Sequence, residues 1–257
     1  MATSLFSDII FGPVQSRRLG LSLGVNLLPL NNKLCSFECI YCECGWSLKG
    51  VRSQFNRKKD VITALKDKLT EMASQGRLPD VITFAGNGEP TMHPDFEQII
   101  DQTIAIRDML APQARISVLS NATFIHKESV RRALLRVDNN ILKLDSAFDS
   151  TARIMDKPKG DYSVEQQVEL MKQFNGRLII QTMFLKGMVD GEVIDNTTDQ
   201  EVQAWLELIQ SIAPSKVMVY TIDRDTPLKT LEKIPVEKLK EIASRVESLG
   251  IECSVAG

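Results

Sequence analysis

The segment Asp80-Val-Ile-Thr-Phe-Ala-Gly-Asn-Gly-Glu-Pro-Thr91 joins an apolar run of strand length to a glycine-rich turn, and an amphipathic run of helix length follows from near Pro94. Strand, turn and helix in this order form one βα unit. Similar pairs of runs lie on both sides of it from about Ser22 onward. The alternation predicts consecutive βα units and a parallel sheet.

Further strands are expected at residues 21–28, 115–119, 141–145, 178–184, 216–221 and 251–255. Helices are expected at residues 60–75, 127–136, 163–174, 199–212 and 235–249. One face of the first helix carries Val61, Leu65, Leu69 and Met72, and Gly76 is expected to end it. Residues 186–198 have weak periodicity and are interpreted as a mobile loop.

About six βα units and a last short strand are fewer than the eight units of a closed barrel. We therefore predict an α/β fold, a partial (open) (β/α)6 TIM-like barrel, in a single domain over residues 1–257. A Rossmann sheet is the rival architecture.

The composition is that of a globular protein, with 43% hydrophobic and 25% charged residues among 257. No stretch approaches the roughly 20 apolar residues that span a bilayer, and Met1 to Ser16 lacks a basic segment followed by an apolar core. We expect a cytoplasmic protein with no membrane partner. The formal net charge of -2 argues against a protein that coats nucleic acid nonspecifically.

Four of the five cysteines lie between Cys35 and Cys44. Three of them form the pattern Cys35-Ser-Phe-Glu-Cys39-Ile-Tyr-Cys42, directly after the first expected strand. Such short spacings suit metal ligation better than a disulfide framework. An iron–sulfur cubane held by three thiolates keeps one iron free for another ligand. The pattern therefore predicts a cluster on Cys35, Cys39 and Cys42.

A zinc knuckle is the alternative, and it needs a fourth protein ligand such as Cys44, a histidine or Cys253. Tetrahedral zinc sites usually contain two separated ligand pairs, and this chain has no second CxxC. We expect Cys44 to be a thiol near the site and Cys253 to belong to the core.

The turn that follows the strand at residues 81–85 has two glycines and a carboxylate, Gly86, Gly88 and Glu89. Glycine lets the backbone approach a ligand closely, and a carboxylate accepts hydrogen bonds from an ammonium group. An amino-acid headgroup suits such a site, although a plain turn has the same residues.

Together these two motifs resemble the radical S-adenosylmethionine (SAM) superfamily, with Tyr41 as the aromatic residue before the last cysteine and residues 87–90 in place of GGEP. Asn87 replaces the first glycine of that motif. The resemblance implies a [4Fe-4S] cluster, SAM bound near Tyr41, Gly86, Gly88 and Glu89, and an external electron donor of flavodoxin or ferredoxin type. The implied activity is that of a metal-binding oxidoreductase that cleaves SAM to a 5′-deoxyadenosyl radical for hydrogen abstraction.

Ligand-binding residues of βα barrels gather at the carboxyl ends of strands. Ser120 and Asn121 end one expected strand and suit ribose hydroxyls, although Asn121 also suits a turn. Lys143 and Asp145 share one face of the next strand, for the SAM carboxylate and a ribose hydroxyl or as a structural ion pair. Thr182 is a further candidate.

Residues 11–43 also resemble a subgroup distantly similar to wyosine-forming tRNA enzymes, through Gly12-Pro13, residues 16–20 and residues 22–24. Basic residues flank the cysteine loop and suggest a docking patch for an anionic substrate, either RNA or a phosphorylated small molecule. They are Arg17, Arg18, Lys49, Arg52, Arg57, Lys58 and Lys59.

Two other functions compete with this one: an iron–sulfur electron-transfer or cluster-carrier protein without SAM turnover, and a zinc-stabilised RNA-binding protein. A glycyl-radical activase, a tRNA-modifying enzyme and a small-molecule or peptide mutase are all open as the specific activity, because fold does not supply the substrate.

Overall fold

The computed structural model describes residues 5–16, 19–51 and 53–257. Eight strands form one sheet in the order β1-β2-β3-β4-β5-β6-β9-β11. They are β1 (Ile10–Ser16), β2 (Gly20–Val25), β3 (Val81–Phe84), β4 (Arg115–Ser120), β5 (Asn139–Lys143), β6 (Ile179–Met183), β9 (Lys216–Tyr220) and β11 (Glu252–Ala256). β1 is antiparallel to β2, and the other neighbouring strands are parallel.

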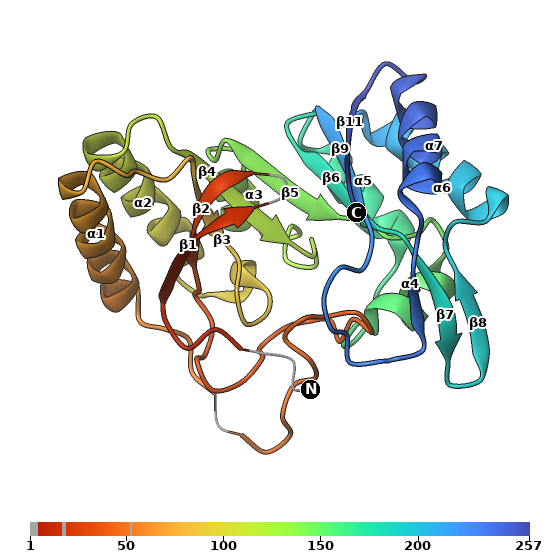
Figure 1. Cartoon of the computed structure of the whole chain (residues 1–257), viewed down its shortest axis with the longest axis horizontal. Helices are drawn as coiled ribbons and strands as arrows, with labels where there is room; N and C mark the ends of the chain where they lie inside the picture. The colour runs from red at the N-terminus through yellow and green to blue at the C-terminus, as the bar shows by residue number, and fades with distance from the viewer. Residues whose placement is uncertain (1–4, 17–18, 52) are drawn as a thin grey trace.

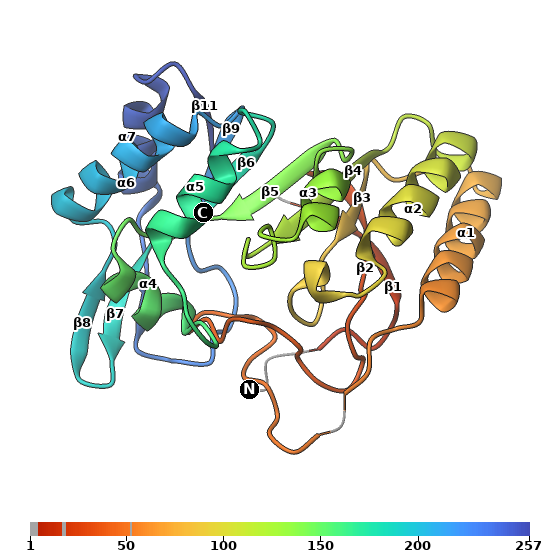
Figure 2. The same cartoon turned by 180° about the vertical axis from the view of Figure 1, so that it is seen from behind.

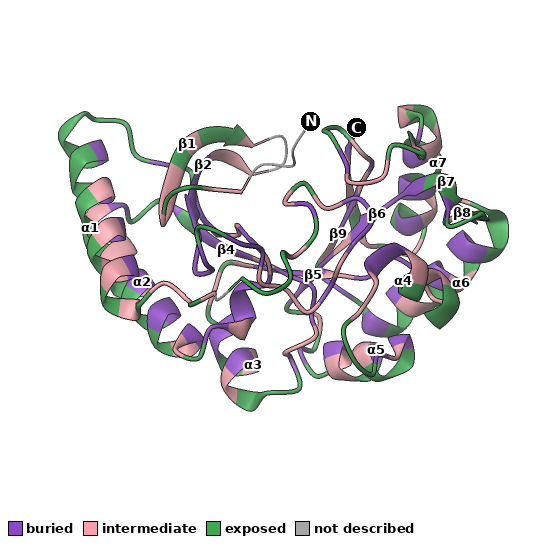
Figure 3. Cartoon of the chain, turned by 90° about the horizontal axis from the view of Figure 1, so that it is seen from below, coloured by how far each residue is buried: buried purple, intermediate pink, exposed green. Residues whose placement is uncertain are grey.

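The sheet is strongly curled, and the helices lie on its outer side (Figure 3). The helices are α1 (Lys58–Ser74), α2 (Phe96–Leu110), α3 (Glu128–Leu134), α4 (Asp149–Asp156), α5 (Val164–Lys172), α6 (Asp199–Ile212) and α7 (Val236–Glu247). Because β1 and β11 are the two ends of the strand order, the barrel is open (Figure 1). The predicted partial βα barrel is confirmed. A Rossmann sheet has helices on both faces and a different strand order, so the rival architecture is wrong.

Burial patterns explain the outer packing. Every residue of β3 is buried, as expected for a parallel strand inside a sheet. In α1 the buried residues are Val61, Leu65, Leu69 and Met72, the face that the sequence predicted. Gly76 follows this helix with a φ of +65°, a left-handed conformation that ends it. The inner side of the sheet has its own small apolar group, Ile141, Ile179 and Met218.

The interpretation of residues 186–198 as a mobile loop is wrong. β7 (Leu185–Val189) and β8 (Glu192–Asp195) form an antiparallel hairpin, and β10 (Leu231–Lys233) pairs with β7 to make a second sheet. The hairpin turn is Asp190-Gly191, with both residues at positive φ. Asp-Gly is a strong signal for a two-residue hairpin turn, and it outweighs the weak periodicity of the flanking residues.

Three other elements were not predicted: β1, α4 and the short 3-10 helix η1 (Pro90–Met92). β1 contains Pro13 and an irregular register between Phe11 and Val14, and a proline inside an apolar run argues against a strand. α4 is a short helix between β5 and α5 (Figure 2), and its eight residues are only about two turns.

Within the described ranges, no helix combines the length and apolar character needed to cross a membrane.

Candidate functional site

The cysteine loop, residues 26–57, connects β2 to α1 and is coloured orange-red to orange in Figure 1. Leu34 of this loop pairs with the turn after β3. The Leu34 backbone N–H donates to Asn87 O at 2.8 Å, and the Glu89 backbone N–H donates to Leu34 O at 3.1 Å. A Cβ at Gly88 would lie 1.9 Å from Leu34 O, so this approach requires glycine. The glycine-rich motif therefore positions the cysteine loop.

Residues 36–40 of the cysteine loop are bound to the region around the end of α4. The Glu38 N–H donates to Asp156 O at 2.9 Å, and the Ile40 N–H donates to Met155 O at the same distance. The Lys159 N–H donates to Ser36 O at 2.8 Å. The loop thus crosses from the β3 side of the sheet to the α4 side, where Figure 1 shows it below the strands.

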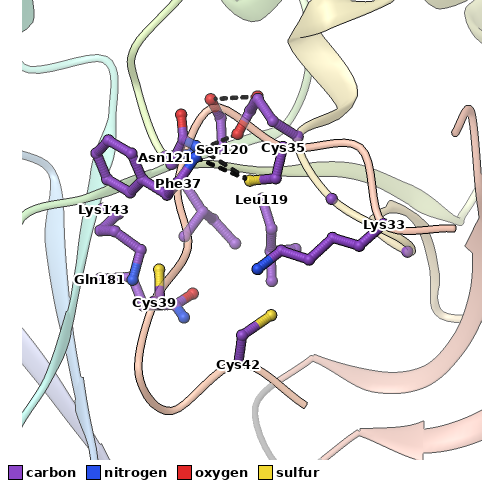
Figure 4. A pocket seen from close by; sticks show the side chains of 14 residues that line it. Lys33, Cys35, Phe37, Cys39, Cys42, Leu119, Ser120, Asn121, Lys143 and Gln181 are labelled. Carbon is purple, nitrogen blue, oxygen red and sulfur yellow. Dashed lines mark hydrogen bonds between the residues drawn. The ribbon is translucent and has the colours of Figure 1, made fainter. Parts of the chain in front are cut away.

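A cavity of about 160 Å³ lies between the cysteine loop and the carboxyl ends of the strands (Figure 4). Nine of the predicted site residues line it: Cys35, Cys39, Cys42, Gly86, Gly88, Glu89, Ser120, Asn121 and Lys143. The other lining residues are Lys33, Phe37, Leu119, Ile141 and Gln181. The two sequence motifs and three strand ends therefore meet at one place.

Glu89 is the buried carboxylate of this cavity, with 2% of its surface exposed. Its Oε1 accepts hydrogen bonds from the Thr91 N–H at 3.0 Å, from the Thr91 hydroxyl and from Ser120 Oγ at 2.9 Å. Its Oε2 accepts one bond, from the Asn121 N–H at 2.7 Å. Burial raises the pKa of Glu89, while the bonds from Thr91 and Asn121 oppose that shift. Oε2 is the carboxylate oxygen with room for a further donor.

Asn121 connects the end of β4 to the cysteine loop. Its Nδ2 donates to Ser36 Oγ at 2.8 Å and to Cys35 Sγ at 3.5 Å. Its Oδ1 accepts a bond from the Thr123 N–H at 3.1 Å, which is the turn expected of an asparagine here. Asn121 therefore lines the cavity and also caps a turn.

The three cysteine thiols have different acidities. Burial raises the pKa of Cys35 to about 12, with a further contribution from Glu89. Burial and Asp156 raise the pKa of Cys39 well above its usual value. Hydrogen-bonding groups of Cys44, with the backbone N–H among them, lower the pKa of Cys42 to about 6, and Lys33 adds to that effect. Cys44 donates to Gly86 O at 3.3 Å and does not line the cavity.

Tyr41 and Asp145 lie behind Lys143 and do not line the cavity. The Lys143 ammonium contacts the Tyr41 hydroxyl and lies 3.0 Å from Asp145 Oδ2. The Tyr41 hydroxyl is in hydrogen-bond contact with Asp145 and lies 3.2 Å from Asp156 Oδ1. Burial lowers the pKa of Lys143, but Asp145 and Asp156 outweigh it and raise the value. The predicted pair of Lys143 and Asp145 is thus a buried ion pair, and only its lysine reaches the cavity.

Thr182 does not line the cavity. It is fully buried, and its hydroxyl donates to Leu144 O at 2.7 Å. Its neighbour Gln181 lines the cavity, since adjacent strand residues point to opposite faces. Side chains of a strand alternate between its two faces, so this alternation favours Gln181 over Thr182 once the inward-facing side of the strand is known.

Two further residues of the site, Lys33 and Asp156, were not predicted. Lys33 lies two residues before Cys35, and that closeness was an available signal. Asp156 accepts a hydrogen bond from Cys39 Sγ at 3.3 Å, and burial raises its pKa to about 7 although Lys143 opposes the shift. It ends the unpredicted helix α4, so no sequence pattern singled it out.

The basic stretch lies away from the cavity lining. Arg57 precedes α1, has 83% of its side chain exposed and pairs with Asp60 at 2.7 Å. Lys58 contacts Gln98. Arg17, Arg18 and Arg52 lie outside the described residues.

The sequence matches relatives over most of its length. A UPF0026 protein of Synechocystis is 30% identical over 226 residues, which cover 86% of this chain and 77% of the relative. A UPF0026 protein of Methanocaldococcus jannaschii is 28% identical and covers 91% of this chain and 70% of the relative. A Brachyspira hyodysenteriae protein named GTPase Obg is 27% identical over 96% of this chain. The chain spans 34% of that relative's length.

Solved structures share the fold at low identity. A radical SAM methyltransferase from Sphaerobacter thermophilus has a TM-score of 0.67 and 14% identity, over 91% of this chain and 65% of its own. SuiB of Streptococcus suis bound to SAM has a TM-score of 0.63 and 14% identity, over 88% and 49%. Archaeal TYW1, a wyosine-forming enzyme, has a TM-score of 0.54 and 11% identity, over 88% and 71%.

A family model described as the radical SAM superfamily matches residues 33–209, which include Cys35, Cys39 and Cys42, the glycine-rich turn and the strand ends around the cavity. The match covers more than half of the chain, and the fold agrees with it. The chain therefore belongs to the radical SAM superfamily.

Proposed function

We propose that this enzyme cleaves SAM reductively at a [4Fe-4S] cluster held by Cys35, Cys39 and Cys42, within a single radical SAM domain over residues 1–257. The carrying observation is that the three cysteines and the polar groups of the strand ends line one cavity. Family membership supports the pairing of an iron–sulfur cluster with SAM.

The donor set fits a cubane better than a single metal ion. Among the described residues, no three His, Cys, Asp or Glu side chains are grouped closely enough to hold one ion. A tetrahedral zinc site needs four such ligands around one point. Three thiols spread around a cavity suit a cluster with one iron open to a further ligand.

When bound, the cluster would supply the electron that breaks a C–S bond of SAM, which gives methionine and a 5′-deoxyadenosyl radical that abstracts a hydrogen atom from the substrate. Glu89 Oε2 is the acceptor that we assign to the SAM ammonium, together with the backbone around Gly86 and Gly88. Lys143 is the cation that we assign to the SAM carboxylate, since its partly buried side chain lines the cavity and its ammonium is held by Asp145. The apolar side chains of Leu119 and Ile141 line the cavity and would displace water from bound SAM.

The remaining polar lining groups, Ser120, Asn121 and Gln181, suit the hydroxyl and amide edges of the adenosyl part. We assign Tyr41 and Asp145 to holding Lys143, because both contact its ammonium. Thr182 supports the strand through Leu144 O, and we assign it no contact with SAM.

An electron donor of flavodoxin or ferredoxin type would reduce the cluster, because the reaction consumes one electron per SAM. The substrate class that we propose is anionic, RNA or a phosphorylated small molecule. The basic residues near the cysteine loop support it, and Lys49 there is exposed.

Anaerobic reconstitution tests the proposal. Wild-type protein should take up about four irons and four sulfides, bind SAM, and release 5′-deoxyadenosine when dithionite is added. Changing Cys35, Cys39 or Cys42 singly to Ala should remove most of the iron. Cys44→Ala is the matched control, since this thiol does not line the cavity, and it should keep the iron.

Each competing function gives a different result in that experiment. A cluster that forms without SAM binding or deoxyadenosine release would indicate an electron-transfer or cluster-carrier protein. One zinc per chain in anaerobically purified protein, lost in Cys44→Ala, would indicate the zinc-stabilised alternative.

A further inference from the structure

Lys33 is a buried lysine in the wall of the cavity. Only 1% of its side chain is exposed. Its ammonium donates to Glu38 Oε2 at 3.2 Å and to Gly45 O at 3.0 Å. Lysine is almost never fully buried unless it is paired, so the position needs a physical reason. In Figure 4 the side chain extends along the cavity toward the three cysteines.

The carboxylate beside Lys33 is shared with a second cation. Glu38 Oε1 lies 2.6 Å from the ammonium of Lys159, while its Oε2 faces Lys33. One carboxylate thus faces two ammonium groups, and the group of Lys33, Glu38 and Lys159 has an excess of one positive charge. Lys159 is 47% exposed, so water screens it, whereas Lys33 is buried.

The three cysteines are the other neighbours of Lys33. Cys35, Cys39 and Cys42 line the same cavity as the Lys33 side chain. The excess positive charge of the group of Lys33, Glu38 and Lys159 therefore lies beside the thiols that we assign to the cluster. A buried charge is costly without an opposite charge, and three thiolates ligating a cluster would supply one.

We propose that Lys33 raises the reduction potential of the cluster by offsetting the negative charge of its thiolates. This inference rests on the proposed function. Reduction adds one electron to a centre that is already anionic, and a fixed cation nearby stabilises the reduced form more than the oxidised form. Net charge and solvent exposure are among the factors that set such potentials. Lys33 supplies the charge and also lies in the region from which water is excluded.

A structural role for Lys33 is the alternative, because it also connects Glu38 to Gly45 O within the cysteine loop. Variants that keep or remove the positive charge distinguish the structural role from the effect on the reduction potential. Lys33→Gln keeps a hydrogen-bond donor and loses the cation, while Lys33→Arg keeps the cation. Lys159→Gln removes an equal charge from the exposed side of the same carboxylate and is the matched control.

The experiment is an anaerobic redox titration of the reconstituted protein without SAM, followed by electron paramagnetic resonance of the reduced cluster, with iron content and SAM binding measured in parallel. Lys33→Gln should keep its iron and lower the reduced-to-oxidised ratio at a fixed potential at least about tenfold, which is 59 mV for one electron. Lys33→Arg and Lys159→Gln should change that ratio less than about threefold.

An unchanged midpoint in an iron-loaded Lys33→Gln protein would overturn the inference and leave the proposed function intact. Loss of iron in Lys33→Gln with retention in Lys33→Arg would also overturn it, in favour of a role in holding the cluster. Equal shifts in Lys33→Gln and Lys159→Gln would also overturn it, because the inference rests on the difference between the buried and the exposed cation. If wild-type protein takes up iron but binds no SAM, the proposed function fails while the effect of Lys33 on the midpoint is still measured.

Discussion

Gly88 is the position where the glycine-rich turn and the cysteine loop approach most closely, and replacing it by alanine is a sharp test of that packing. The new Cβ would lie 1.9 Å from Leu34 O, whereas real Cβ atoms essentially never come within 3.0 Å of another heavy atom. Leu34 would have to move by about 1 Å. Its two backbone hydrogen bonds, to Asn87 and Glu89, would weaken or break.

The loss of folding free energy in Gly88→Ala can be estimated from these contacts. Two hydrogen bonds contribute about 1–3 kcal/mol together. The φ of Gly88 is +138°, and a non-glycine residue in such a conformation adds about 1–3 kcal/mol of strain. Gly88→Ala should therefore lower the free energy of unfolding by about 2–6 kcal/mol.

Gly191→Ala is the matched control, because Gly191 has a φ of +89° and a Cβ added there would meet no atom within 4 Å. It should lose only the strain, about 1–3 kcal/mol. Urea unfolding of the metal-free proteins measures both changes, and iron uptake by Gly88→Ala should fall as the cysteine loop shifts. Equal losses in the two variants, with normal iron uptake in Gly88→Ala, would refute the role of Gly88 in this packing.

Three other results follow from the site. Glu89→Gln should weaken SAM binding about tenfold with iron content unchanged, because a hydrogen bond to a charged acceptor is worth roughly 1.5 kcal/mol more than one to a neutral acceptor. Equal SAM affinities of the variant and the wild-type protein in calorimetry would remove Glu89 from the site. In metal-free protein Cys42 should react with iodoacetamide faster as pH rises through about 6, because its thiolate fraction rises there, whereas Cys35 should react slowly up to about pH 10. Mass spectrometry of peptides labelled between pH 5 and 9 measures both rates, and faster labelling of Cys35 than of Cys42 would contradict this order. If RNA is the substrate, changing Arg57, Lys58 and Lys59 together to alanine should weaken the binding of bulk tRNA at about 50 mM salt and flatten its salt dependence in gel shifts, while uncoupled SAM cleavage persists. Absence of tRNA binding by the wild-type protein would contradict an RNA substrate.

The long helices were predictable from the sequence because each has one buried face, which gives a regular spacing of apolar residues. Helix α6 begins and ends at the predicted residues 199–212, and α1 has the predicted apolar face. Elements whose stability depends on tertiary partners were missed. β1 contains a proline and pairs only at the sheet edge, and α4 has too few turns for a clear period. The β7–β8 hairpin had a local signal in Asp190-Gly191, which the weak periodicity on either side obscured.

Residue types in short motifs located the site, but they did not give side-chain direction. Cys35, Cys39, Cys42 and Glu89 line the cavity together because the loop and the turn pair through their backbones. Thr182 lies outside the cavity lining because the face that each residue of β6 presents depends on the register of β6 with β5, which no local pattern contains. Asp156 was not predicted from the sequence because only the folded chain brings it to Cys39.

The open edge between β1 and β11 has a mechanical consequence for the cysteine loop. In a closed barrel every strand has two neighbours, whereas β1 and β11 each have one neighbour in this sheet. The loop is bound to the β3 side through Leu34 and to the α4 side through Glu38 and Ile40. It therefore links two parts of the open sheet that β1 and β11 do not join, and the distance between these two attachment points fixes the spacing between Cys35 and Cys39.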